Sequence, residues 1–198
     1  MKKLQLSIMI FIILLLFTTC GSTSDVSEEN NSGTEDQNHD VNPYYIIESF
    51  TSSDMNVGSK FPELTWKDNE GNLVSLSDMG ASVYLIDIWA TWCGPCRQEI
   101  PHLIEMHEKF GPEGLIVIGI SVDDNPDLLP PFIESQGITY ITLQTSNNDL
   151  INTILSKGGG AIPQTFVLNS NSEIHQSFLG YSPAIGSEIE KSIEEVIE

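Results

Sequence analysis

Two cysteines three positions apart, Cys93 and Cys96, constrain the fold of this chain more than any other feature. They follow an apolar run at 83–89 and precede a stretch, 95–110, whose apolar residues recur at helical spacing. A C-x-x-C pair between a strand and a helix is typical of dithiol chemistry. If the helix begins just after Cys93, that thiol lies at a helix N-terminus, where unpaired N–H groups and the helix dipole favour a thiolate. We therefore expect Cys93 to attack and Cys96, one turn further along, to resolve the product.

The cysteine count supports a reactive pair. The chain has three cysteines, and the third, Cys20, lies in the N-terminal segment. One remaining pair cannot make a disulfide scaffold, and a cross-link over so short a loop stabilises little, which argues against an inert structural disulfide. Structural zinc needs two more nitrogen or sulfur ligands, and the sequence has no second C-x-x-C. We therefore expect neither a metal nor a cofactor at this pair.

The N-terminal segment 1–19 has the features of a secretory signal. Lys2 and Lys3 precede an apolar run at 4–17, which is too short to favour a stable transmembrane helix. Because Cys20 follows directly, the segment resembles a bacterial lipoprotein signal, in which cleavage before Cys20 leaves a cysteine that carries acyl chains. A secreted chain with an incidental cysteine and an uncleaved anchor are the alternatives.

Residues 20–56 form the next segment, and we expect them to be an acidic, disordered tether. Residues 22–42 contain almost no large apolar side chain, so they cannot bury enough surface to offset the entropy of ordering. The apolar residues within 44–50 either pack on the domain or stay unordered. The formal net charge of −20 argues against a nucleic-acid partner and against electrostatic binding to anionic lipid, so a membrane link would be covalent.

The folded domain is expected to span 57–198, with strands and helices in alternation. Short runs on either side of the turn at 68–72 predict a β-hairpin. The expected strands and helices then follow in the order strand 83–89, helix 95–110 with a kink at Pro101, strand 115–122, helix 126–136, strand 140–143, helix 149–155, a second hairpin at 165–179 and a terminal helix from Ser187 to Ile197. The terminal helix is placed by the capping-box pattern at 187–190. This order predicts a three-layer α/β domain with a mixed sheet.

Three stretches together resemble the thioredoxin-fold proteins of the membrane-tethered TlpA/ResA branch. They are 87–96, which contains the cysteines, the strand end at 121–123, and 162–166. The resemblance implies a thioredoxin-like α/β/α domain with an added N-terminal β-hairpin. It also implies a monomeric, membrane-anchored thiol–disulfide oxidoreductase outside the cytoplasm, which reduces protein disulfides such as those of cytochrome c apoproteins. A partner in the membrane would supply the electrons.

Two carboxyl groups are expected near the dithiol. Asp87 lies within an apolar strand, where desolvation should raise its pKa and let it accept a proton from Cys96. It matches the buried aspartate of thioredoxins, whereas the TlpA/ResA branch more often has asparagine there. The alternative is that Asp87 faces solvent or caps local N–H groups. Glu99 matches a glutamate that tunes the cysteines in the ResA-like branch, and an exposed helix carboxylate is the alternative reading of it.

The segment around Pro163 is expected to bind the substrate chain. Pro163 resembles the cis-proline that faces the dithiol in this fold, and the backbone of Ile162 would pair with a substrate chain by strand addition. An ordinary trans proline is the alternative. Trp92 would shield one side of the site and contact the partner, whereas Arg97 is expected on a solvated face.

Two other functions are compatible with the sequence. A peroxiredoxin-like peroxidase is disfavoured because Ala90, rather than threonine or serine, stands three residues before Cys93. A copper-binding assembly protein would use both cysteines and a distant histidine such as His175. The acidic residues from Asp123 onward lack the spacing of a calcium loop, so they predict a capped turn. The histidines of the domain, His102, His107 and His175, are expected to be surface residues rather than ligands.

Overall fold

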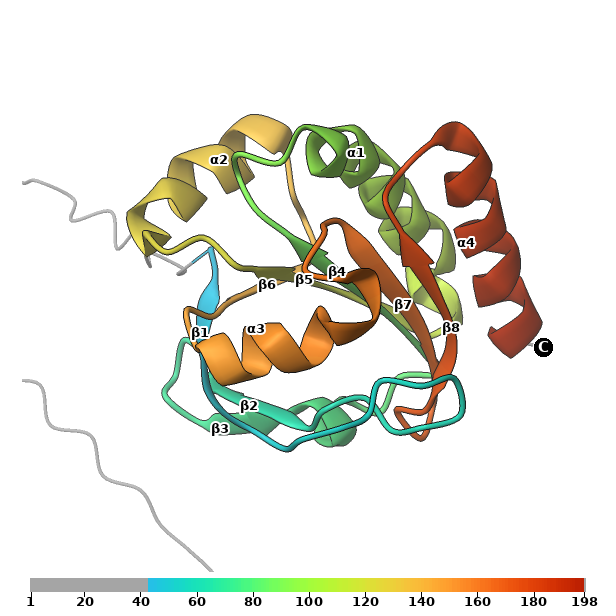
Figure 1. The fold of residues 1–198 in the computed structure, drawn as a ribbon, viewed down its shortest axis with the longest axis horizontal. Helices are drawn as coiled ribbons and strands as arrows, with labels where there is room; N and C mark the ends of the chain where they lie inside the picture. Colours follow the sequence, from blue (N-terminus) through green and yellow to red (C-terminus); the bar gives the residue numbers. More distant parts are fainter. Residues whose placement is uncertain (1–42, 198) are drawn as a thin grey trace, which may run out of the picture. The chain divides into compact units, whose positions relative to one another are not determined.

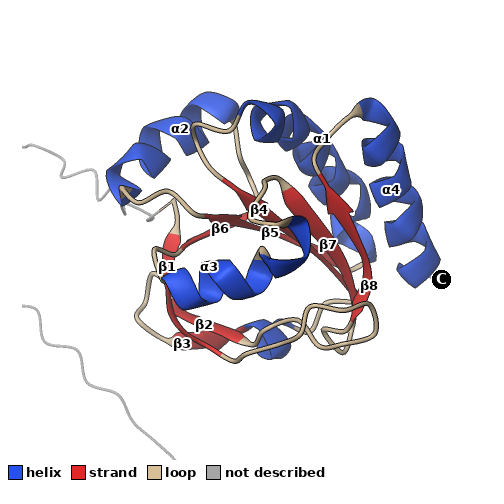
Figure 2. Cartoon of the chain, in the orientation of Figure 1, coloured by secondary structure: helices blue, strands red, loops and turns tan. Residues whose placement is uncertain are grey.

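A mixed β-sheet runs through the computed structural model, which describes residues 43–197 (Figures 1 and 2). The strands are β1 (Tyr45–Phe50), β2 (Leu64–Lys67), β3 (Leu73–Ser75), β4 (Val83–Trp89), β5 (Leu115–Ser121), β6 (Ile141–Gln144), β7 (Gln164–Asn169) and β8 (Ile174–Leu179). The signal segment, Cys20 and the stretch up to residue 42 lie outside the described residues. Within 43–197, no helix is both long and apolar enough to cross a membrane.

Strand β4, which leads to the two cysteines, lies inside the sheet with a neighbouring strand on each side. The order is β3-β2-β1-β6-β5-β4-β7-β8, and β4 pairs in parallel with β5 and antiparallel with β7. All seven residues of β4 are buried, because helices cover one face of the sheet and the hairpin with a further helix covers the other. The continuous apolar run at 83–89 is the pattern expected of a strand covered on both faces.

Four α-helices and four short 3₁₀ turns complete the described part. The helices are α1 (Gly94–Phe110), α2 (Leu129–Gln136), α3 (Asn148–Ile154) and α4 (Pro183–Ile197). The 3₁₀ turns are η1 (Leu76–Met79), η2 (Gly111–Glu113), η3 (Pro126–Leu128) and η4 (Ser156–Gly158). One core packs α1 and α4 on the sheet, and a second core packs α3 between the opposite face and the hairpin β2–β3. The thioredoxin-like three-layer architecture with an added N-terminal hairpin is therefore confirmed.

Strand β1 differs from the sequence-based expectation. Its residues fall in the segment assigned to the tether, yet β1 pairs antiparallel with β2 and in parallel with β6. The side chains of Tyr45, Ile47 and Phe50 pack against the core that also holds the hairpin. The folded unit thus includes residues before Val57, and the apolar side chains of this segment pack on the domain.

Helix α4 begins earlier than its capping-box pattern predicts. The helix starts at Pro183, and the Ile185 N–H donates to Ser182 Oγ at 3.3 Å. Ser187 lies one turn inside, where its Oγ donates to the Pro183 carbonyl instead of capping an end. The expected start at Ser187 is therefore wrong, because Ser182 followed by proline is a competing N-terminal signal.

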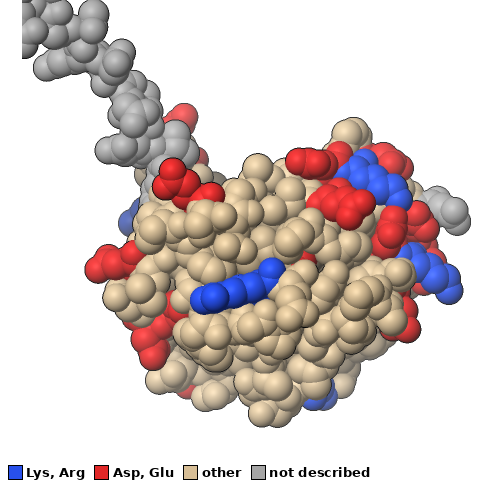
Figure 3. Space-filling view, turned by 90° about the horizontal axis from the view of Figure 1, so that it is seen from above, with Lys and Arg blue, Asp and Glu red and all other residues tan. Residues whose placement is uncertain are grey.

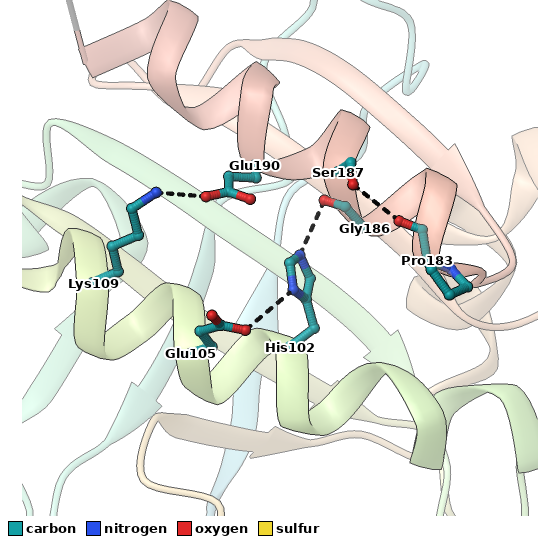
Figure 4. Close-up of polar contacts among 7 residues, drawn as sticks. All are labelled: His102, Glu105, Lys109, Pro183, Gly186, Ser187 and Glu190. Atoms are coloured by element: carbon teal, nitrogen blue, oxygen red, sulfur yellow. Dashed lines mark hydrogen bonds and ion pairs between the residues drawn. The ribbon is translucent and has the colours of Figure 1, made fainter.

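Side chains of α1 hold α4 in place along one seam (Figure 4). His102 Nε2 donates to the Gly186 carbonyl at 3.0 Å, and its ring lies 6.2 Å from that of Tyr181. Two turns further along, Lys109 pairs with Glu190. His102 is therefore half-buried in the contact between α1 and α4, with 15% of its side chain exposed, and not a fully exposed surface residue.

Candidate active site

Cys93 and Cys96 form a disulfide at the N-terminus of α1. Cys93 is the N-cap residue, with an extended backbone, and its Sγ accepts from the Cys96 N–H at 3.2 Å. This contact gives the Cys93 sulfur a donor that favours a thiolate once the disulfide is reduced. Cys93 is 5% exposed and Cys96 is fully buried. A substrate sulfur therefore reaches Cys93 first, as the order of attack and resolution requires.

The Ile162–Pro163 peptide lies beside Cys93. This bond is cis, as expected, and the Ile162 carbonyl oxygen lies 3.8 Å from Cys93 Sγ. The carbonyl of Pro163 accepts from the Gly180 N–H at 2.9 Å, which ties this loop to the end of β8. Trp92, which directly precedes Cys93, is 67% exposed. Cys93 thus follows an exposed aromatic residue in the chain and lies beside the cis Ile162–Pro163 peptide in space.

Asp123 holds the loop that leads from β4 to Cys93. Its buried carboxylate accepts from the Thr91 N–H at 2.8 Å, from the Thr91 hydroxyl at 2.7 Å and from the Ser121 hydroxyl at 2.9 Å. The expected capped turn is present, and its function is to fix the residue two positions before Cys93. Arg97 also donates to the Thr91 carbonyl and lies over the Phe132 ring, so it braces this loop.

Asp87 is buried on the α1 side of β4. It is fully inaccessible, and neither carboxylate oxygen has a hydrogen-bond partner among the described residues. Burial raises its pKa well above the usual range, and the negative charge of Glu99 raises it further. Thr165 and the Ile88 backbone lie close enough to lower this pKa in part. The solvent-facing alternative is therefore wrong, and the expected desolvation is confirmed.

Glu99 is buried one turn after Cys96, so the exposed alternative is wrong for it too. Its Oε1 accepts from the Thr165 hydroxyl at 2.7 Å, and burial raises its pKa to about 7 despite that hydrogen bond. Thr165 is the register partner of Asp87 across β4 and β7, so one threonine lies next to both carboxyl groups. The sequence reasoning missed Thr165, although its position two residues after Pro163 was the available signal.

The structure does not bring together the residues that the copper-binding and peroxidase alternatives need. His175 is the second residue of β8 and lies at the end of β7 that pairs with the start of β4, whereas the cysteines follow the end of β4. The copper arrangement of Cys93, Cys96 and His175 is therefore not formed. Within residues 43–197, no three His, Cys, Asp or Glu side chains could together hold a metal ion. Ala90 offers no hydroxyl to Cys93, and the Thr91 hydroxyl is committed to Asp123.

The face of the molecule on the α1 and α2 side is mostly uncharged (Figure 3). One basic side chain lies near its middle, and the acidic side chains gather toward its rim. A chain with a formal net charge of −20 therefore presents a face on which another protein surface meets little repulsion.

Comparisons with known proteins agree with this geometry. A sequence model of the AhpC/TSA family matches residues 57–177. The thiol-disulfide oxidoreductase ResA of Bacillus thuringiensis (strain Al Hakam) is 24% identical over 126 residues, which cover 64% of this chain and 71% of the relative. ResA of Geobacillus kaustophilus (strain HTA426) is 27% identical over 63% of this chain and 70% of the relative.

A solved structure from Chlorobium tepidum, assigned as the thiol:disulfide interchange protein DsbE, has a similar fold. It is 26% identical with a TM-score of 0.63, and the match covers 72% of this chain and 99% of that chain. A secreted thiol-disulfide isomerase from Corynebacterium glutamicum, 24% identical with a TM-score of 0.57 over 64% of this chain and 77% of that one, shares the fold. The chain therefore belongs to the AhpC/TSA family, and within it carries the thioredoxin fold and dithiol of the thiol–disulfide oxidoreductases.

Proposed function

We propose that this protein is a membrane-tethered, extracytoplasmic thiol–disulfide oxidoreductase that reduces protein disulfides through Cys93 and Cys96. The observation that carries the proposal is the arrangement around Cys93. Its sulfur lies 3.8 Å from the Ile162 carbonyl, beside an exposed Trp92. An extended substrate segment can add to the backbone at Ile162 while its disulfide meets Cys93.

The reaction proceeds in two exchange steps. The Cys93 thiolate attacks one sulfur of a substrate disulfide, that S–S bond breaks, and the other substrate sulfur leaves as a thiolate and takes a proton from water. Cys96 then gives its proton to the Asp87 carboxylate, and its sulfur attacks Cys93. The mixed disulfide breaks, the second substrate sulfur leaves as a thiolate that takes a proton from water, and the Cys93–Cys96 disulfide remains. The substrate has gained two electrons, which a second dithiol protein must restore to this chain.

The buried carboxyl groups support reduction as the direction of electron flow. A strongly oxidising dithiol owes its potential to a reduced form that is stabilised by a thiolate. Here Cys96 is fully buried, like Asp87 and Glu99, and burial acts against a thiolate on Cys96 just as it acts against the two carboxylates. The reduced form is therefore less favoured, and the chain gives electrons to other disulfides more readily.

The relatives and the N-terminal sequence support the proposed substrates and location. Two relatives are named ResA, and the resemblance to that branch supports protein disulfides such as those of cytochrome c apoproteins as substrates. In an oxidising compartment, the electrons must come from a dithiol partner in the membrane. The signal pattern and Cys20 support a lipid anchor that faces outward, and the chain is proposed to act as a monomer.

Trapping of substrates tests the exchange chemistry. Cys96→Ser removes the resolving sulfur, so substrates should accumulate in cells as mixed disulfides on Cys93 that reductant releases. The matched control is the double variant Cys93→Ser with Cys96→Ser, which should trap nothing. The proposal fails if Cys96→Ser traps no protein and Cys93→Ser leaves cells unchanged.

Anchoring has its own test. Cys20→Ser should move the chain from the membrane fraction to the soluble extracytoplasmic fraction, because one lipid-bearing residue holds it there. Ser22→Ala, two positions away, should leave it in the membrane fraction. A Cys20→Ser chain that stays with the membrane would contradict a lipid anchor. It would not bear on the dithiol chemistry.

A further inference from the structure

Buried polar groups without a partner gather beside the active site. Among the described residues, eight buried side-chain nitrogen or oxygen atoms make no hydrogen bond to the protein, and seven of them belong to one group of residues. These residues are Asp87, Trp89, Glu99, His107, Tyr140 and Thr142. Polar groups inside proteins nearly always have partners, so a concentration of this kind indicates a small polar ligand.

The sheet brings these groups into one row. Strand pairing places Thr165, Asp87, Gly119 and Thr142 side by side on neighbouring strands, and residues in register point to the same face. Gly119 has no side chain, and two other side chains occupy the space above it. A Cβ atom at this position would lie 2.7 Å from Trp89 Nε1 and 3.1 Å from Tyr140 Cε2.

Tyr140 links this row to the surface. Burial raises the pKa of its hydroxyl well above the usual value, and the charges of Asp87 and Glu99 raise it further, so the hydroxyl lies within electrostatic reach of both carboxyl groups. Tyr140 also lines a pocket of about 260 Å³ together with Thr142, Ile133 and Ile138. The ring of His107, in α1, lies 6.5 Å from the ring of Tyr140.

The groups in the row suit water. The Trp89 N–H can only donate, the hydroxyls of Tyr140 and Thr142 donate and accept, and Asp87 accepts as a carboxylate and also donates as an acid. Buried water makes about three hydrogen bonds to such groups. A path is also needed, because Asp87 takes a proton when the mixed disulfide is resolved and Cys96, which is fully buried, closes the other side.

We propose that Trp89, Tyr140 and Thr142 hold water against Asp87 and form a proton path from the buried carboxyl groups to the pocket beside β6. The path rests on the proposed function, since it carries the proton that Cys96 gives up. Asp87 passes one proton to the nearest water, and a proton leaves from the last water to solvent in the pocket, so no charge accumulates. Tyr140 stays neutral and acts as a positioning residue.

Several groups that can ionise belong to the elements packed around Asp87. After burial, the charge of Glu99 from α1 is the next cause that raises the pKa of Asp87, and the charges of Asp87 and Glu99 add to the effect of burial on the pKa of Tyr140, which precedes β6. Cys96 and His107 also belong to α1, and the His107 ring lies 6.5 Å from the ring of Tyr140. Burial, and after it the charge of Glu99, raises the pKa of Tyr181. The test must therefore follow Asp87 itself and not a bulk property of the chain.

Tyr140→Phe is the decisive variant, because it keeps the ring and removes the hydroxyl. In the oxidised chain, the carboxyl carbon of Asp87 is followed by NMR between about pH 5 and pH 10. Loss of a donor to the carboxylate should move the Asp87 midpoint upward by about half a pH unit or more. In the reduced chain, resolution of a mixed disulfide on Cys93 should slow about three- to tenfold at neutral pH, and its pH profile should move in parallel.

Tyr84→Phe is the matched control, because this buried tyrosine already donates to the Leu76 carbonyl and accepts from the Ala81 N–H. It should change stability but neither the Asp87 midpoint nor the pH profile. Thr142→Val, which is nearly isosteric, provides a second measurement of the Asp87 midpoint if Tyr140→Phe does not fold. An Asp87 midpoint that moves in neither variant overturns the path. A wild-type chain that resolves no mixed disulfide contradicts the proposed function instead, and the titration still decides whether Tyr140 and Asp87 are coupled.

Discussion

The Thr165 hydroxyl donates to Glu99 Oε1 at 2.7 Å, so a side chain of β7 holds a carboxylate of α1 on the buried side of the dithiol. The other oxygen of Glu99 has no hydrogen-bond partner among the described residues. Because Thr165 is also in register with Asp87, one hydroxyl lies beside both carboxyl groups: it donates to Glu99 and also lowers the pKa of Asp87 in part. Burial and the charge of Glu99 raise the pKa of Asp87 well above its usual value, whereas burial raises that of Glu99 to about 7, so Glu99 ionises before Asp87.

Thr165→Val should raise the pKa of Glu99 above its value of about 7, because the hydrogen bond from Thr165 lowers that pKa. The loss should cost about 1–3 kcal/mol of unfolding free energy above pH 7, where Glu99 is ionised, and less in acid. NMR titration of Glu99 and urea unfolding measure the two effects. Thr153→Val, which removes a hydroxyl bonded to the Asp149 carbonyl in α3, should leave the Glu99 titration unchanged. An unmoved Glu99 midpoint in Thr165→Val would show that the hydroxyl does not act on it.

Asp87→Asn should make the oxidised chain more stable and less active. Since the folded pKa of Asp87 is raised, the folded state binds more protons than the unfolded state between the two pKa values, and stability falls as pH rises through that window. Asparagine removes this loss, so we expect a gain of about 1–3 kcal/mol at pH 7 and little change near pH 4.

The activity of Asp87→Asn should change in the opposite direction. Resolution of the mixed disulfide should slow by about tenfold or more, since the group that accepts the Cys96 proton is gone. Denaturant unfolding at two pH values and single-turnover kinetics give both numbers. An unchanged resolution rate at neutral pH would remove Asp87 from the proton transfer, whatever its effect on stability.

Gly119→Ala should destabilise the chain by about 1–3 kcal/mol, because its Cβ would meet Trp89 Nε1 at 2.7 Å within a packed core. The control is Gly111→Ala, at a helical backbone conformation where an added Cβ has no neighbour within 4 Å. It should be close to neutral in the same urea titration. Equal stability of the two variants would contradict the close packing above β5.

Asp123→Ala should loosen the loop before Cys93. Three donors of Thr91 and Ser121 would lose a buried charged acceptor, at an expected cost of about 2–4 kcal/mol. The amide of Thr91 should also exchange with deuterium faster. Asp124→Ala removes the exposed neighbouring carboxylate and should change neither quantity. Fast exchange at Thr91 in the wild type would show that Asp123 does not hold this loop.

Local sequence patterns predict the parts of the site that lie close together in the chain. The apolar run at β4, the cysteines at the start of α1 and the buried position of Asp87 all follow from residues 83–96. The burial of Glu99 does not, because its partner Thr165 is 66 residues away and the contact depends on the register of β4 with β7. Helical periodicity alone leaves open which side of α1 meets the sheet at that turn.

Strand β1 and the start of α4 are two other features that local sequence patterns do not predict. The exposed and half-buried residues of β1 mix irregularly, and its partner β6 is about a hundred residues further along the chain, so no local pattern indicates the pairing. For α4, Ser182 and Ser187 are both acceptable caps. The longer helix is stabilised by a contact outside α4, since His102 donates to the Gly186 carbonyl.

The pairing of β1 with β6 also determines how the chain can be shortened. Tyr45 and Ile46 are in register with Leu143 and Gln144, so β1 covers an edge of the central sheet that would otherwise present free N–H and C=O groups. A chain that begins at Val57 would expose that edge, and unpaired edges invite other chains to add strands. Recombinant versions meant to stay soluble and monodisperse should therefore begin before Pro43.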